Sequence, residues 1–207
     1  MSITQNTSVI FSDAAFAWPD GSPVLAGVDE SFGLGRTGLV GANGTGKTTV
    51  LRLIAGELEP TAGSIEASGA VGYLPQQLTL QTDATVADLF GVRDSLDALR
   101  AIERGDTDPR HFDAVGDGWD VEARSAAVLD SVGLGHVDLD RAVGTLSGGE
   151  TILAALAGLR LADTPIVLLD EPTNNLDRDA RHRLYETITS WRRTLIVVSH
   201  DTQLLEL

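Results

Sequence analysis

Gly41-Ala-Asn-Gly-Thr-Gly-Lys47-Thr48 is the stretch that decides the fold of this chain. It fits the pattern G-x-x-x-x-G-K-[ST], which forms a glycine-rich loop around phosphate groups. A short strand pattern at 36–40 precedes the loop, and apolar residues at helical spacing follow it at 47–55. Because the pattern requires this strand–loop–helix context, the sequence predicts a phosphate-binding loop.

The residue types of this loop suit a nucleotide bound with Mg²⁺. Gly41, Gly44 and Gly46 lack a Cβ, so backbone N–H groups can converge on phosphate oxygens. Lys47 can reach the β- and γ-phosphates, and the hydroxyl of Thr48 can ligate Mg²⁺. Of the 15 basic residues, Lys47 alone is a lysine. A compact point charge is therefore favoured here over the planar fork of arginine.

A second group of polar residues follows a buried strand pattern. The run Ile166-Val-Leu-Leu-Asp170-Glu171 places two carboxylates at the end of continuous apolar sequence. Two acids after a strand can simply form a solvated loop. In a parallel sheet, however, ligands bind beyond the carboxyl ends of the strands. Beside a phosphate loop, Asp170 fits a Mg²⁺-associated carboxylate and Glu171 fits the base that polarises the attacking water.

Composition narrows the class of protein. The chain has 207 residues, 43% of them hydrophobic, which is enough for one packed domain. Its net charge of −15 disfavours direct nucleic-acid binding through a basic face. The absence of cysteine excludes disulfides and thiolate chemistry, and His111, His136 and His182 show no metal-ligand spacing. Without a signal peptide or a membrane-length apolar run, we expect a cytoplasmic protein.

Strands alternate with helices along the chain, so we expect an α/β fold with a parallel sheet. Antiparallel strands are expected over 9–32, and an acidic, mostly helical insert is expected to begin at 82. Asp177 can cap a helix that carries Ala180, Leu184, Ile188 and Trp191 at helical spacing. We expect a single domain over 1–207. Its β subdomain with the phosphate loop spans 1–81, the helical insert 82–145, and the remaining core 146–207.

Further motifs carry a family resemblance that covers essentially the whole chain. Leu146-Ser-Gly-Gly-Glu150 resembles the signature motif of ATP-binding-cassette (ABC) ATPases and lies upstream of Asp170, as in that family. Gln76, in Tyr73-Leu-Pro-Gln-Gln77, is similar to the Q-loop glutamine. Thr173-Asn-Asn-Leu-Asp177 resembles the D-loop, and His200 resembles the switch histidine. The resemblance implies the parallel-sheet core of P-loop NTPases, with ATP and Mg²⁺ as the bound species.

The resemblance also implies roles for individual residues. The catalytic residues would be Glu171, His200 and Gln76, and the Mg²⁺ ligands Thr48, Gln76 and Asp170. The ATP-binding residues would be Trp18, Gly41, Asn43, Gly44, Gly46, Lys47, Thr48 and Thr49, with Trp18 stacking on adenine. The residues that contact the ATP of a partner cassette would be Ser147, Gly148, Gly149 and Glu150, with Asp177 in the D-loop.

Plainer interpretations stay open for several of these residues. Trp18 can be a core aromatic, and His200 a structural histidine. Gln77 can be the Q-loop residue in place of Gln76. Ser147 can be an ordinary helix N-cap, although in the family that cap also presents N–H groups to a phosphate.

The run from Glu171 to Asp177 is similar to the E-P-T-N-H-L-D of the F subfamily, with Asn175 where histidine is usual. Proteins of that subfamily carry two cassettes in one chain and act on ribosomes, in translation or antibiotic resistance. The resemblance therefore implies a second cassette as partner, in the same chain or in a homodimer, and the ribosome. The alternative is the ATP-binding subunit of a membrane transporter, with transmembrane subunits as partners. A second cassette beyond residue 207 would favour the first of these, and a gene for a transporter partner the second.

Overall fold

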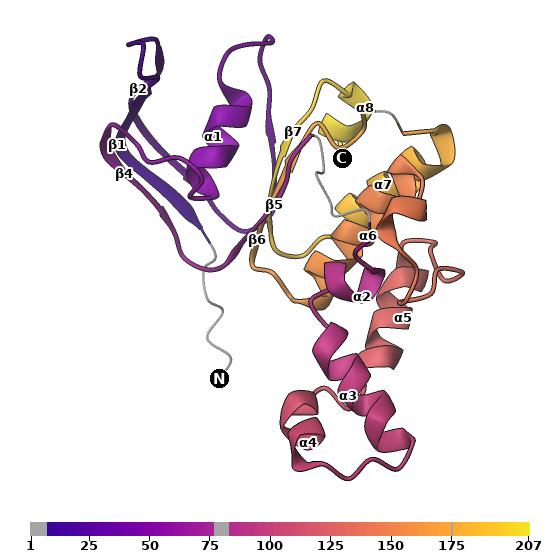
Figure 1. Ribbon diagram of the computed structural model, residues 1–207. Coiled ribbons are helices and arrows are strands. Elements are labelled where there is room, and N and C mark those ends of the chain that lie inside the picture. Colours follow the sequence, from indigo (N-terminus) through magenta and orange to yellow (C-terminus); the bar gives the residue numbers. More distant parts are fainter. Residues whose placement is uncertain (1–7, 77–82, 175) are drawn as a thin grey trace. The chain divides into compact units, whose positions relative to one another are not determined.

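The computed structural model describes residues 8–76, 83–174 and 176–207, and it confirms the α/β fold (Figure 1). The described residues form two compact units. The first, here called the phosphate-loop unit, comprises 8–76, 164–174 and 188–207. The second, here called the helical unit, comprises 83–163 and 176–187.

An antiparallel sheet with strand order β2-β1-β4 occupies one side of the phosphate-loop unit. Its strands are β1 (Val9–Ala17), β2 (Pro23–Phe32) and β4 (Ala62–Ala67). A tight turn joins β1 to β2, with the N–H of Trp18 donating to the carbonyl of Ser22 at 2.9 Å. The antiparallel pairing expected over 9–32 is confirmed.

A parallel sheet with order β3-β7-β6-β5 forms the other layer of this unit. Its strands are β3 (Arg36–Leu39), β5 (Val71–Leu74), β6 (Ile166–Asp170) and β7 (Thr194–Val198). Every residue of β6 and β7 is buried, as their continuous apolar sequences predict. Because the strands are parallel, their carboxyl ends share one edge, and the loops that follow them converge there.

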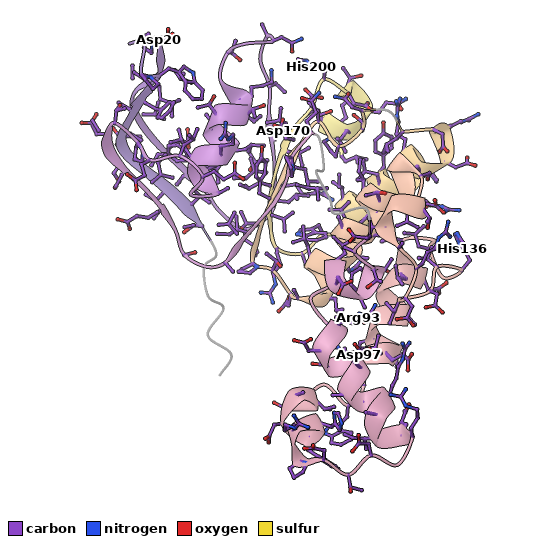
Figure 2. All side chains as sticks on the ribbon, in the orientation of Figure 1. Asp20, Arg93, Asp97, His136, Asp170 and His200 are labelled. Atoms are coloured by element: carbon purple, nitrogen blue, oxygen red, sulfur yellow. The ribbon has the colours of Figure 1, made fainter. Side chains whose placement is uncertain are left out.

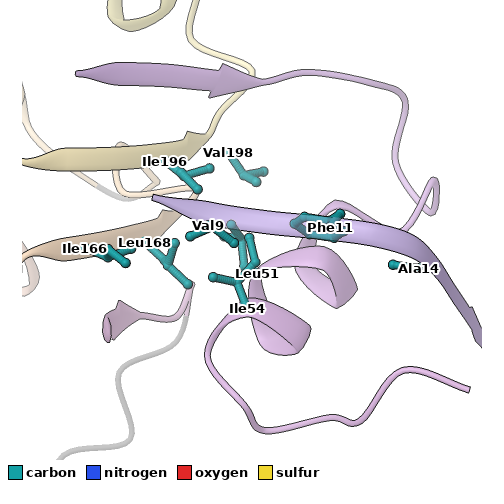
Figure 3. Close-up of a cluster of buried hydrophobic side chains, with 9 residues drawn as sticks. All are labelled: Val9, Phe11, Ala14, Leu51, Ile54, Ile166, Leu168, Ile196 and Val198. Carbon is teal, nitrogen blue, oxygen red and sulfur yellow. The ribbon is translucent and has the colours of Figure 1, made fainter. Parts of the chain in front are cut away.

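Helix α1 (Lys47–Ile54) packs between the two sheets of the phosphate-loop unit (Figure 3). Its apolar face contributes Leu51 and Ile54 to the core. The buried side chains that meet there come from β1, α1, β6 and β7: Val9, Phe11, Ala14, Leu51, Ile54, Ile166, Leu168, Ile196 and Val198. This core holds α1 against β6 and β7. A short helix, α8 (Thr202–Leu205), ends the unit.

The helical unit contains six helices in its described residues and a 3₁₀ turn at Val143–Thr145. The helices are α2 (Val86–Leu89), α3 (Arg93–Glu103), α4 (Pro109–Val115), α5 (Val121–Ser131), α6 (Gly148–Leu161) and α7 (Arg178–Thr189), whose last two residues belong to the other unit. Capping boxes begin α2 and α6, and Asp108 caps α4.

The helix that was predicted to include Trp191 ends before that residue. Trp191 continues the apolar spacing of Leu184 and Ile188, yet α7 ends at Thr189 and Trp191 lies beyond it. The indole is nevertheless buried. The periodic spacing therefore predicted burial correctly and the extent of the helix incorrectly. Within the described residues, no helix has both the length and the apolar character that crossing a lipid bilayer requires.

Candidate active site

A cavity of about 640 Å³ opens at the carboxyl edge of the parallel sheet, within the phosphate-loop unit. The loops after β5, β6 and β7 and the start of α1 surround it. Its lining residues are Trp18, Val24, Asn43, Gly44, Gly46, Lys47, Thr48, Thr49, Gln76, Asp170, Glu171, Asn174, Val198 and His200. Figure 2 shows Asp170 and His200 at this end of the sheet. Candidates separated by up to 182 positions thus line one cavity.

The first turn of α1 has the backbone geometry of an anion site. Gly46 is the N-cap residue, in the left-handed region at φ 92°, and no side chain of the described residues caps the helix. A Cβ at Gly46 would lie 2.3 Å from Cγ1 of Val24, so only glycine fits. The uncapped N–H groups at a helix start and the positive end of its dipole favour a bound phosphate.

Lys47 holds its ammonium group over the same loop. Its Nζ donates to the carbonyl oxygens of Gly41 at 2.8 Å and Ala42 at 3.0 Å. These two contacts direct the single lysine of the chain along the loop. The Gly41 backbone helps to position the lysine, although Gly41 does not line the cavity.

Asp170 lies at the base of the cavity and is only 2% exposed. Its Oδ2 accepts a hydrogen bond from the Tyr73 hydroxyl at 3.4 Å. Burial, together with the nearby Asp170 charge, raises the pKa of Tyr73 far above its usual range, so the hydroxyl stays protonated and donates. Oδ1 of Asp170 has no hydrogen-bond partner among the described residues. A buried carboxylate oxygen without a protein partner is suited to hold a water molecule or a metal ion.

The donors in the cavity fit Mg²⁺. Thr48 and Asp170 supply hard oxygen atoms, and the amide of Gln76 lines the same cavity. No cluster of three or more acidic, histidine or cysteine side chains suited to a metal occurs in the described part of the chain. Mg²⁺ commonly takes one or two protein oxygens and completes its shell with phosphates and water, so this sparse donor set fits a nucleotide-bound Mg²⁺.

Glu171 is held in an unusual backbone conformation beside the cavity. Its φ of 49° is positive, which costs a non-glycine residue about 1–3 kcal/mol and is common at functional sites. Its N–H donates to the Val198 carbonyl at 2.8 Å, and its Oε2 accepts from the His200 N–H at 3.3 Å. The end of β7 therefore fixes the direction of this carboxylate.

His200 is bracketed by two residues of the cavity. Its Nε2 lies 2.8 Å from Oδ1 of Asn43 and 3.3 Å from Oε1 of Glu171. Both neighbouring atoms are acceptors, so Nε2 can donate to them when it carries hydrogen. The three side chains join the phosphate loop, the end of β6 and the end of β7 at one point of the cavity. Sequence reasoning named all three but gave no contact between Asn43 and His200.

Two of the candidate residues, Trp18 and Gln76, had alternative interpretations in the sequence. Trp18 lines the cavity and also packs against Phe16 in a T-shaped arrangement, with ring centroids 5.1 Å apart. A stacking surface and a core contact are thus both present. Gln76 lines the cavity, whereas Gln77 lies outside the described residues. Asp177, the expected D-loop residue, caps α7 by accepting from the Ala180 N–H at 2.8 Å.

The signature residues lie in the helical unit, at the start of α6. The Ser147 Oγ accepts from the Glu150 N–H at 3.2 Å, and the Glu150 carboxylate accepts from the Ser147 N–H at 2.8 Å. A Cβ at Gly149 would lie 2.7 Å from Cβ of Ala180, so α7 packs too closely for a larger residue. The Ser147 backbone N–H holds the pKa of Glu150 below its usual range. Ser147 is therefore a genuine N-cap, and its hydroxyl also hydrogen-bonds the Glu150 carboxylate.

Four residues of the site were not predicted from the sequence: Val24, Tyr73, Asn174 and Val198. Tyr73 reaches Asp170 because β5 pairs in parallel with β6, and a single sequence does not specify that pairing. A tyrosine three residues before Gln76 on an expected strand was the only available signal. Val24 was not predicted either, because it belongs to β2 of the antiparallel sheet, and a single sequence does not specify how that sheet packs.

Comparison with known proteins gives consistent matches. The profile described as ABC transporter matches residues 32–174. The chain is 39% identical over 196 residues to the tylosin resistance ATP-binding protein TlrC of Streptomyces fradiae, covering 83% of this chain and 35% of that protein. It is 30% identical to ABC transporter F family member 5 of Arabidopsis thaliana, covering 83% of this chain and 28% of that protein. The chain thus spans about a third of the length of these relatives.

Among solved structures, a putative ABC transporter ATP-binding protein from Pyrococcus furiosus superposes with a TM-score of 0.67 at 22% identity. The match covers 94% of this chain and 92% of that one. At this identity the likeness establishes the fold.

Proposed function

The chain belongs to the ABC transporter family, whose ATPase domains are P-loop ATP hydrolases that bind ATP with Mg²⁺, and on this premise we propose that it is one cassette of an F-subfamily protein. It binds MgATP in the cavity of the phosphate-loop unit and hydrolyses it after pairing with a second cassette. A single ABC domain over 1–207 comprises the β part with the phosphate loop (1–81), the helical insert (82–145) and the remaining core (146–207).

One observation carries the proposal: the uncapped start of α1, Lys47, the unpartnered Asp170 oxygen and Glu171 all line one cavity. In this assignment Lys47 and the N–H groups from Gly41 to Thr49 hold the phosphates, and Trp18 stacks on the adenine. Thr48, Asp170 and Gln76 hold Mg²⁺, which when bound neutralises charge on the β- and γ-phosphates.

Glu171 is the general base of the proposed reaction. Its carboxylate accepts a proton from the attacking water, and the backbone fixed by Val198 keeps the carboxylate at the cavity. His200 donates from Nε2 toward a γ-phosphate oxygen, the same hydrogen that it directs at Asn43. Gln76 positions the water. The strained backbone of Glu171 is consistent with a catalytic position.

Pairing supplies the missing part of each site. Ser147, Gly148, Gly149 and Glu150 would contact the ATP of the other cassette, and Asp177 would lie at the junction. The place of these residues at the positive end of the α6 dipole supports this role. The second cassette is expected in the same chain, because the relatives are about three times as long.

The F-subfamily assignment rests on the similarity to ABC transporter F family member 5 and to TlrC, and on the sequence from Glu171 to Asp177. We therefore propose a cytoplasmic protein that acts on the ribosome, in translation or antibiotic resistance. The acidic cassette alone is not expected to bind nucleic acid directly.

The test uses the full-length protein that carries this chain. Glu171→Gln, together with the equivalent change in any second cassette, should trap ATP and cosediment with ribosomes in MgATP but not in MgADP. Lys47→Ala in the same background should abolish the cosedimentation. Association with a membrane fraction through transmembrane subunits, without ribosomes, would replace this assignment with a transporter subunit.

A further inference from the structure

The α4 tip (residues 109–120) presents two large aromatic side chains to solvent. Phe112 is 44% exposed and Trp119 is 52% exposed, with ring centroids 6.0 Å apart and planes inclined at 53°. By contrast, Phe11, Phe16 and Phe90 are each less than a tenth exposed. Adjacent exposed aromatics are costly to leave in water and are enriched at binding surfaces.

Contacts of the surrounding backbone hold the two aromatic residues in position. Helix α4 is anchored by the Ser95 hydroxyl, which donates to the Ala114 carbonyl at 3.0 Å, and by the buried Val115. The chain then turns back through Gly116, and the Gly118 N–H donates to the Val115 carbonyl at 2.7 Å. This turn brings Trp119 against Phe112. The two rings are therefore held in place before binding, which lowers the entropy that binding would cost.

The charge around the rings is negative. From 104 to 120 there are five aspartates and two arginines. Arg110 is paired with Asp108 at 2.7 Å, and His111 lies 3.0 Å from Asp106. Within the described part of the chain, Asp113 and Asp117 pair with no cation or hydrogen-bond donor. The exposed aromatic faces thus have an acidic border with uncompensated charge.

We propose that the α4 tip docks a lysine- and arginine-rich segment of another protein. Cationic side chains stack on the faces of Trp119 and Phe112, where the ring quadrupole attracts them. Asp113 and Asp117 attract the same segment and set its register. A nucleic acid fits poorly, because its phosphates would face these carboxylates. The inference concerns a surface apart from the nucleotide cavity and does not depend on ATP turnover.

The experiment follows the tryptophan indole N–H signals by NMR in the ¹⁵N-labelled chain. The chain has three tryptophans, so the Trp119 signal is assigned by its loss in Trp119→Phe. The probe is a synthetic ten-residue peptide of alternating arginine and glycine. It should shift the Trp119 signal in a saturable manner and leave those of Trp18 and Trp191 in place. The affinity should fall as salt is raised.

Variants separate this surface from the general acidity of a chain with net charge −15. Phe112→Ala should weaken peptide binding by about 3- to 10-fold in this titration. Trp119→Ala removes the indole signal, so its binding is followed by titration calorimetry, where the same loss of about 3- to 10-fold is expected. Asp113→Asn with Asp117→Asn should weaken it by a similar factor. The matched control, Glu59→Gln with Glu66→Gln, removes two exposed acids from the other unit and should change nothing.

Spectra of each variant confirm that the chain remains folded. Equal weakening by the control pair, or uniform shifts of all three indole signals, would reduce the binding to nonspecific charge and overturn the proposal. A single-stranded RNA that shifts the Trp119 signal more strongly than the peptide would also overturn it.

Discussion

Two helices of this molecule begin at glycine-rich motifs, and their first turns are prepared in opposite ways. At α1, Gly46 offers no side chain as a cap, and Lys47 places a positive charge beside the free N–H groups. At α6, Ser147 and Glu150 satisfy each other's backbone N–H groups in a capping box. One helix start is left open to an external anion, whereas the other is closed by its own residues.

The difference shows which start depends on a ligand. Uncapped N–H groups and a concentrated positive charge are stabilised by a bound phosphate, so ligand binding adds to the stability of the phosphate-loop unit. The α6 start gains about 1 kcal/mol from its own cap and needs no ligand to form. Its place at the positive end of the helix dipole still favours a partner's phosphate. Substitutions at the α1 start should therefore affect nucleotide binding, and substitutions at the α6 start should affect the free energy of unfolding.

The largest effect is expected at Glu171, beside the open start. Glu171→Gln should retain MgATP binding and lose turnover by about 10²- to 10⁴-fold, because an amide cannot accept a proton from the attacking water. Phosphate release by the full-length protein measures it, with Glu59→Gln as a control for an exposed acid. Turnover equal to the wild type would remove Glu171 from the role of base.

The next effect tests the open start itself. Lys47→Ala should weaken MgATP by about 10- to 100-fold, because each charge-assisted contact contributes about 1.5–3 kcal/mol. Lys47→Arg should also weaken it, since a planar fork cannot reproduce the ammonium contacts with Gly41 and Ala42.

Titration calorimetry on the chain and on Arg104→Ala, an exposed control, provides the comparison. Unchanged affinity in Lys47→Ala would show that the nucleotide binds elsewhere.

How much the sequence reveals depends on how local the signal is. The phosphate loop could be predicted because its glycines and lysine are adjacent. Strands β6 and β7 could be predicted because continuous apolar runs indicate burial on both faces. The positive φ of Glu171 and the Asn43–His200 contact could not be predicted, because each depends on strand pairing between distant segments. Trp191 illustrates the same limit, because its spacing indicated burial and gave no signal that α7 ends two residues earlier.

A smaller effect is expected at the closed start. Ser147→Ala should lower the free energy of unfolding by about 1 kcal/mol, the usual contribution of an N-cap. It should leave MgATP affinity of the single chain unchanged, because Ser147 would contact only a partner's nucleotide. Urea unfolding and calorimetry on the same samples measure both quantities. A fall in affinity comparable to that of Lys47→Ala would contradict the division between the two helix starts.

The smallest effect concerns the pH dependence of the same cap. The hydrogen bond from the Ser147 backbone N–H lowers the pKa of Glu150, so the folded chain holds this proton less tightly than the unfolded chain. The ionised cap therefore contributes its stability above the unfolded pKa of about 4.3 and loses it as pH falls through the lower folded value. Glu150→Gln retains an acceptor for the Ser147 N–H but cannot titrate.

The difference in unfolding free energy between the wild type and Glu150→Gln isolates this group, because the other carboxylates cancel. We expect an advantage for the wild type of about 0.3–1 kcal/mol at neutral pH, from the carboxylate at the positive end of the α6 dipole. The advantage should disappear as pH falls from the unfolded pKa through the lower folded value. Urea unfolding at a series of pH values tests it. A difference that stays constant with pH would show that the carboxylate charge contributes nothing to the cap and that hydrogen-bond geometry alone closes the start of α6.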